Sequence, residues 1–342
     1  ADTVVVDPGD ELINLKWGLR LSSISDDNGV LYLFDEYDAS VSHINLDKLT
    51  LDQKSYFEAE GPDGIGVRIT NFQALSSGNL TFISSTRAKT FSQEGELIQD
   101  IDLNPAKITG LELGGGANLT YNSILSEDGK YFFSLPGSYM RGTRDLAVIE
   151  STSSAGKIID IPAMDVTFDS RIILKGEMVQ IYMEEIYLQN IENKLYIVSS
   201  ATSDLYRYDY EMDSMELFSF PITVTEKAKN IPVKNDVSSL EEFNAEREKV
   251  ANQIGFRKLI WDEAHGLLFR FGTISLPKNH PDDEGKEEVY LYAFDTNMRL
   301  VGETRLNKLT EVPEYSFFKE GKLWSYVNVE DELGFAVFTF DF

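Results

Sequence analysis

A sixfold repeat is the feature of this sequence that most restricts its fold. Each copy places a turn residue, usually glycine, before a short aromatic and aliphatic run, and successive turn residues are 49, 51, 64, 73 and 55 positions apart. Runs this short, bounded by turn residues, are typical of β-strands. The six copies are Gly29 before Leu31–Phe34, Gly78 before Leu80–Ile83, Gly129 before Tyr131–Phe133, Asn193 before Leu195–Val198, Gly266 before Leu267–Phe269 and Gly321 before Leu323–Tyr326.

Further β-rich runs surround each copy and bring the count to four strands per unit. One run precedes the turn, as in Leu19–Ile24, and two follow it across a polar turn, as in Ser40–Leu46 and Leu51–Phe57. Polar turns that contain Asp or Gly between β-rich runs are typical of hairpins. Six units of four strands predict an all-β fold, a six-bladed β-propeller that occupies residues 1–342 as a single domain.

The two ends of the chain predict how this ring closes. The sixth unit has runs at 315–318, 323–327 and 335–340 and lacks a fourth, whereas a spare run, Thr3–Val6, precedes the first unit. A solenoid would need polar caps at both ends instead. We therefore expect the N-terminal strand to pair as the outer strand of the last blade.

The segment between Ile222 and Gln253 interrupts the β pattern. Ser239 and Glu242 have the spacing of a capping box, and Leu240, Phe243 and later apolar residues keep roughly helical spacing. This pattern predicts one inserted helix at about 239–253. The helix would cover either the edge of a blade or, as a lid, the channel.

Composition excludes several classes of function. The net charge of −26 repels nucleic-acid phosphates, so we expect no nucleic-acid partner. The chain has no cysteine and three scattered histidines, His43, His265 and His280, whose spacing matches no metal motif. We expect no metal and no cofactor. No apolar stretch is long enough to span a membrane. We also expect the protein to be a monomer.

Two features carry a resemblance to a known group of proteins. They are the loop Gly61-Pro62-Asp63-Gly64-Ile65-Gly66 and the repeated second strands of the type Leu-Tyr-Leu-Phe. In these the chain resembles six-bladed β-propeller proteins of unknown function from Bacteroides-type lipoproteins, which are related in architecture to NHL- and TolB-like propellers. The resemblance implies export to the periplasm or cell surface, with a lipid anchor on an upstream cysteine. It implies no activity.

Three Gly-apolar-Arg triplets suggest a binding site. Arg20, Arg68 and Arg257 lie 11, 12 and 10 positions before Leu31, Leu80 and Leu267, at the start of the first strand of their units, and similar counting reaches Glu184 and Glu185. First strands line the channel of a propeller, so these side chains would converge near one mouth. Guanidinium groups there would bind a carboxylate, sulfate or uronate. Alternatively, each arginine pairs with a neighbouring acid and locks adjacent blades together.

The sequence therefore favours a non-enzymatic binding protein of the cell envelope. Its ligand-binding residues would be Arg20, Arg68, Arg257, Glu184 and Glu185, and its partner an anionic glycan or a protein at the channel mouth. The alternative is a carbohydrate-active enzyme, a hydrolase or lyase, that uses acids such as Glu184 or Glu185. Its catalytic carboxyl pair cannot be chosen among 57 acidic residues.

Overall fold

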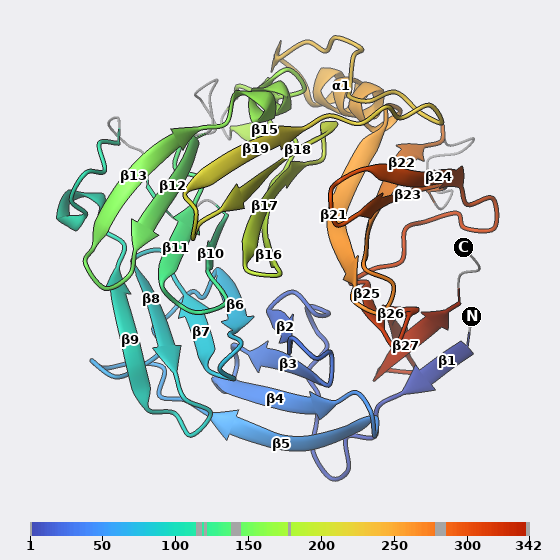
Figure 1. Cartoon of the computed structure of the whole chain (residues 1–342). Helices are drawn as coiled ribbons and strands as arrows, with labels where there is room; N and C mark the ends of the chain where they lie inside the picture. Colours follow the sequence, from blue (N-terminus) through green and yellow to red (C-terminus); the bar gives the residue numbers. More distant parts are fainter. Residues whose placement is uncertain are drawn as a thin grey trace. The chain divides into compact units, whose positions relative to one another are not determined.

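The computed structural model describes residues 2–113, 118–119, 122–137, 145–176, 179–277 and 285–339. Within these ranges the chain forms six four-stranded sheets and one three-stranded sheet (Figure 1). The residues group into two compact units. Unit 1 comprises residues 1–136, 146–159 and 313–342, and unit 2 comprises residues 137–145 and 160–312.

Four of the four-stranded sheets belong to unit 1, and three of them follow chain order. Those three contain β2 (Ser22–Ile24), β3 (Val30–Asp35), β4 (Ser40–Asn45) and β5 (Thr50–Tyr56); then β6 (Asn71–Ala74), β7 (Leu80–Ile83), β8 (Arg87–Phe91) and β9 (Leu97–Asp102); then β10 (Ser123–Leu125), β11 (Tyr131–Ser134), β12 (Asp145–Glu150) and β13 (Ala155–Asp160). The fourth has the order β1 (Asp2–Val5), β27 (Glu332–Phe338), β26 (Lys322–Val329) and β25 (Phe317–Lys319).

Unit 2 has two four-stranded sheets and the three-stranded one. The four-stranded sheets contain β16 (Ile186–Ile191), β17 (Lys194–Ser199), β18 (Thr202–Asp209) and β19 (Ser214–Phe218); then β21 (Gly255–Asp262), β22 (Leu267–Ser275), β23 (Glu287–Asp295) and β24 (Leu300–Arg305). The three-stranded sheet has the order β15 (Gln180–Tyr182), β14 (Ile172–Leu174) and β20 (Asp236–Val237).

The repeat found in the sequence corresponds to the hairpin between the first and second strands of each four-stranded sheet. Five of its six turn residues have positive φ, from +56° at Asn193 to +81° at Gly78, and in the first copy Asn28, with φ +53°, replaces Gly29 in this role. Positive φ favours glycine and asparagine, which explains the turn residues. The run that follows is the sheet's second strand, and all four residues of β7 are buried.

The N-terminal strand pairs with the last strand of the chain. β1 runs antiparallel to β27, with Asp2 opposite Val337 and Val5 opposite Gly334 (Figure 1). The chain then continues to the first sheet, where Asp7 accepts from the Leu51 N–H and donates to the Leu49 carbonyl. The pairing expected from Thr3–Val6 is therefore present in unit 1.

A glutamine in the first strand repeats one contact in both units. The Gln73 side chain accepts from the Leu125 N–H at 2.7 Å and donates to the Leu125 carbonyl at 3.2 Å. Gln189 makes the same pair of bonds to Leu259, at 2.8 and 2.9 Å. First strands have no sheet partner on their inner side, so each amide satisfies two backbone groups of the next sheet's first strand.

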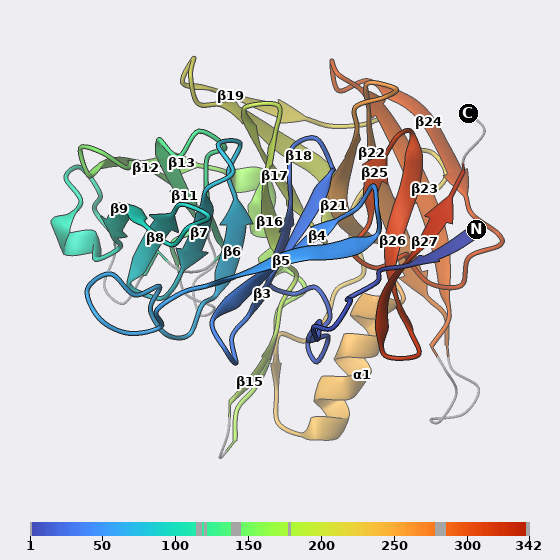
Figure 2. The same ribbon diagram turned by 90° about the horizontal axis from the view of Figure 1, so that it is seen from below.

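The inserted segment contains the expected helix, α1 (Leu240–Ala251). The Ser239 hydroxyl accepts from the Glu242 N–H, and Glu242 accepts in return from the N–H of Ser238, one residue before the expected position. The apolar side of α1 packs on the three-stranded sheet, which the sequence reasoning missed because its strands have only two or three residues. α1 and β15 lie side by side in Figure 2.

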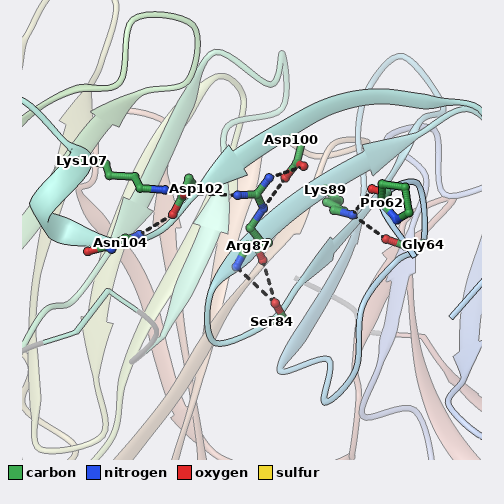
Figure 3. Close-up of polar contacts among 9 residues, drawn as sticks. All are labelled: Pro62, Gly64, Ser84, Arg87, Lys89, Asp100, Asp102, Asn104 and Lys107. Carbon is green, nitrogen blue, oxygen red and sulfur yellow. Dashed lines mark hydrogen bonds and ion pairs between the residues drawn. The ribbon is translucent and has the colours of Figure 1, made fainter. Parts of the chain in front are cut away.

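A buried lysine fixes the loop Gly61–Gly66. The Lys89 ammonium donates to the carbonyls of Pro62, at 2.8 Å, and Gly64, at 2.7 Å (Figure 3). Lys89 is only 7% exposed, so these carbonyls replace its water. On the same strand, Arg87 makes two bonds to Asp100 and one to Asp102, which also binds Lys107 (Figure 3).

The two lysines of Figure 3 allow a matched test of this arrangement. Lys89→Met is expected to lower the free energy of unfolding by about 1–3 kcal/mol, because two carbonyls lose their donor. Lys107→Met removes an exposed ion pair and should cost less than about 1 kcal/mol. Urea unfolding followed by tryptophan fluorescence measures both. Equal costs would contradict the role assigned to Lys89.

Candidate functional site: a two-cation bulge on β21

Three of the five residues selected from the sequence lie together in unit 2. Glu184 and Glu185 immediately precede β16, and Arg257 lies on β21, the first strand of the next sheet. Both glutamates and Arg257 act electrostatically on Tyr187. Their proximity follows from the contact of β16 with β21, which Gln189 fixes through Leu259.

β21 contains a bulge at Arg257 and Lys258. Phe256 pairs with Gly272 and Leu259 pairs with Arg270, so two residues of β21 face the single residue Phe271 of β22. In a regular strand, consecutive side chains point to opposite faces. The bulge exposes both Arg257 and Lys258, between the buried Phe256 and Leu259. Bulges of this kind redirect side chains and are frequent beside functional sites.

A buried arginine holds the bulge in place. Arg270 is 1% exposed, and its Nε donates to the Arg257 carbonyl at 2.8 Å. Its two terminal nitrogens donate to the carbonyls of Ser203, at 2.9 Å, and Ser199, at 2.7 Å, in the neighbouring sheet. Burial lowers the pKa of Arg270 to about 9, which leaves the guanidinium charged at neutral pH. One cation thus joins the bulge carbonyl to two strand ends.

On the β16 side, a buried acid has both oxygens engaged. Glu184 is 4% exposed. It accepts from the Tyr182 hydroxyl at 2.9 Å and the Ser200 hydroxyl at 2.5 Å, and Lys229 Nζ lies 3.7 Å away. Burial lowers the pKa of Lys229, and Glu184 opposes that shift. Lys229 also donates to the Val250 carbonyl near the end of α1, so the pair ties α1 to β16.

Arg257 and Lys258 keep donors that the described part of the chain does not neutralise. The only carboxylate within 4 Å of Arg257 among the described residues is that of Glu287, at 3.5 Å, and its bond to Thr273 is long, at 3.4 Å. Lys258 makes no described ion pair, and its ammonium lies 5.3 Å from the centre of the Tyr187 ring. Lys258 is exposed, and desolvation lowers its pKa, with Glu185 opposing.

The other two arginines selected from the sequence belong to unit 1. Arg20 is exposed and makes a 2.7 Å ion pair with Glu36, which directly follows β3 in the same sheet as β2. Arg68 is exposed, with a φ of +57°. Convergence of the three arginines on one mouth stays a prediction.

The sequence reasoning missed Lys258, Tyr187 and Lys229. A signal for Lys258 was present, because two consecutive polar residues inside the apolar run Phe256–Trp261 break the alternation of a strand, as a bulge does. Lys229 carried no such signal, because its partner is 45 positions away.

The histidines hold ordinary structural contacts where they are described. His43 is buried beside the Ser55 hydroxyl at 3.0 Å, and His265 contacts Asp262 at 2.6 Å. His280 lies outside the described residues. Within the described ranges, no group of three or more His, Cys, Asp or Glu side chains could hold a metal ion. No helix found there is long and apolar enough to cross a membrane.

Comparison with known proteins places the chain in a family. The sequence model of a family described as "Domain of unknown function (DUF4221)" matches residues 1–305. The chain belongs to this family. A crystal structure of a DUF4221 member from Bacteroides vulgatus is 14% identical, with a TM-score of 0.66 over 98% of this chain and 96% of that one. The two share a fold. No curated protein matches the sequence.

Two further solved structures have lower similarity. A putative exported protein from Bacteroides fragilis is 10% identical, with a TM-score of 0.48 over 96% of this chain and 85% of that one. A β-propeller domain from Myceliophteria thermophila is 10% identical, with a TM-score of 0.40 over 92% and 95%. The chain itself is an all-β protein of four-stranded sheets with propeller-like neighbours.

The role of Arg270 can be tested by its removal. Arg270→Met should lower the free energy of unfolding by about 3–5 kcal/mol, because three carbonyls lose a charged donor at once. The control is Arg305→Met, which removes the exposed ion pair between Arg305 on β24 and Glu288 on β23. It should lower the free energy of unfolding by less than about 1 kcal/mol. Urea unfolding compares the two. A cost for Arg270→Met as small as the control would show that the bulge does not depend on it.

Proposed function

We propose that this protein is a non-enzymatic binding protein that binds a carboxylate or sulfate group of its ligand at Arg257 and Lys258. The observation that carries the proposal is the bulge, which exposes two adjacent cations on one strand. The Arg257 carbonyl in this bulge accepts a hydrogen bond from the fully buried Arg270. The two cations are therefore in position before a ligand binds. Preorganisation of this kind lowers the entropic cost of binding.

The chemistry of the two cations suits an oxyanion. A guanidinium presents paired N–H donors that match the two oxygens of a carboxylate or sulfate, and an ammonium adds a compact charge beside it. The chain as a whole carries a net charge of −26, so an anionic group would be attracted to the two cations rather than to the surrounding surface. An anionic glycan, the partner expected from the sequence, carries such groups.

The alternative of a carbohydrate-active enzyme receives less support from the same residues. A glycosidase needs a carboxylic acid that reaches the substrate and exchanges a proton with it. Glu184 is buried with both oxygens engaged, and the Glu185 side chain accepts from the Tyr187 hydroxyl. These contacts suit acids that position neighbouring side chains rather than acids that exchange a proton with a substrate. They favour the binding function over the enzyme.

We also propose that the six four-stranded sheets are the blades of one closed propeller, a single domain over residues 1–342. Support comes from the chain order of the sheets and from β1, which completes the sheet of β25–β27. Location in the cell envelope, in the periplasm or on the surface with a lipid anchor upstream, is a further proposal from the resemblance to Bacteroides-type lipoproteins. Fractionation of cells that express the natural full-length protein tests it.

Binding to an anionic oligosaccharide provides the direct test of the site. Titration calorimetry with oligogalacturonate and with a sulfated chondroitin oligosaccharide separates the carboxylate from the sulfate. Arg257→Gln and Lys258→Gln should each weaken binding by about tenfold or more, the equivalent of one charge-assisted hydrogen bond. The control Arg305→Gln should leave it unchanged. Absence of binding to both oligosaccharides, or an equal loss with the control, would refute the anion site.

The site also predicts a pH dependence. The folded pKa of Lys258 lies below that of an ordinary lysine, so as the pH rises its charge disappears at a lower pH than that of an ordinary lysine. Anion affinity should therefore fall on the alkaline side, starting below the usual lysine range. Lys258→Arg, which stays charged, should abolish this fall. An alkaline fall that persists in Lys258→Arg would assign it to another group.

A further inference from the structure

A second concave site lies in unit 1, separate from the residues of the anion site. It is a cavity of about 260 Å³ at the start of β2. Its floor is apolar and is formed by Leu21, Leu33 and Phe34, which are each less than 7% exposed. The proposed function does not use this cavity.

Two aromatic residues, Trp17 and Tyr37, line the cavity and are open to solvent. Trp17 is 67% exposed and Tyr37 is 94% exposed. Trp and Tyr are the residues that most often dominate binding energy when they flank a pocket.

Both rings sit on turns that local hydrogen bonds hold. The Trp17 turn is closed by the Gly18 N–H, which donates to the Leu15 carbonyl at 2.9 Å, and Gly18 has the positive φ, +56°, that the turn needs. The Tyr37 N–H donates to the Asp35 carboxylate at 2.9 Å. Both rings are therefore attached to hydrogen-bonded turns, which reduces the conformational entropy lost on binding.

Two polar contacts join the segment 14–20 of the lining to the segment 35–36. The Asn14 amide donates to the Asp35 carboxylate at 3.0 Å, and the Arg20 guanidinium donates to the Glu36 carboxylate at 2.7 Å. Lys16, the remaining charged residue of the lining, places its ammonium 5.4 Å from the centre of the Trp17 ring. Two cations therefore face two carboxylates, and the lining carries no net formal charge.

We propose that this cavity binds an uncharged sugar ring. The apolar C–H face of a pyranose packs on aromatic rings, and its hydroxyls, each both a donor and an acceptor, pair with the amide, the guanidinium and the carboxylates alike. A charged ligand would have to break an ion pair that already balances the site. A folded protein partner would bury roughly 800 Å² on each side, far more than a cavity of this size offers.

Binding of neutral oligosaccharides, followed at the Trp17 indole, tests this proposal. The probes are oligosaccharides of glucose, mannose, galactose, xylose and N-acetylglucosamine, added to protein that carries 5-fluorotryptophan. The chain has three tryptophans, and Trp17→Phe assigns the Trp17 fluorine signal. We expect at least one sugar to shift that signal in a saturable manner.

Three variants decide whether the cavity is responsible. Trp17→Ala and Tyr37→Ala should each weaken binding about three- to tenfold, through loss of one aromatic wall, as measured by titration calorimetry. Tyr56→Ala is the matched control, because Tyr56 is 62% exposed on β5 and does not line the cavity. It should leave the affinity unchanged. Circular dichroism confirms that each variant is folded.

Several results would overturn the proposal. One is the absence of a shift at Trp17 with every neutral sugar in the panel. Another is an affinity that survives both aromatic substitutions or falls equally with Tyr56→Ala. A peptide selected from a display library that binds through Trp17 and Tyr37, where no sugar does, would assign the cavity to a protein partner instead.

Discussion

The inner edges of the sheets impose the constraint from which the rest of this structure follows. A first strand has backbone N–H and C=O groups with no strand beside them, and unpaired buried backbone groups are costly. Gln73 and Gln189 solve this problem with one side-chain amide each, which bonds both groups of a residue in the next first strand. The bonds also set the spacing between neighbouring sheets and so position whatever side chains the first strands carry.

Buried cations extend the same principle. Lys89 and Arg270 donate to backbone carbonyls of a loop, of strand ends and of a bulge. Such a cation stabilises irregular backbone that no β-ladder can satisfy. In unit 2 the irregular backbone is the bulge of β21, and the result is a pair of exposed cations. The contacts between sheets and the candidate site therefore both depend on side-chain hydrogen bonds to backbone groups that no neighbouring strand satisfies.

The sequence predicted the repeating elements well, but it did not predict the contacts that the selected site residues make. Strands, hairpin turns, the N-terminal pairing and α1 depend on local patterns, such as alternation, positive-φ residues and a capping box, so they could be read from residues close together in the chain. Arg257, Glu184 and Glu185 lie together in unit 2, and their joint role as a binding site stays a prediction. No local pattern indicated that Glu184 is engaged by Tyr182, Ser200 and a lysine 45 positions away, or Arg20 by Glu36. The short strands β14 and β20 left no periodic signal at all.

By itself, the sequence determined that this chain forms six β-units with a helical insertion, because strand and turn preferences are local and repeat. Only the tertiary structure decided which charged residues are closely paired or buried and which are exposed. It neutralised Arg20 with Glu36, buried Glu184 against Lys229, and used Arg270 to hold the bulge that exposes Arg257 and Lys258. Burial and pairing of a charge depend on neighbours that folding brings from distant parts of the chain, and no local pattern records them.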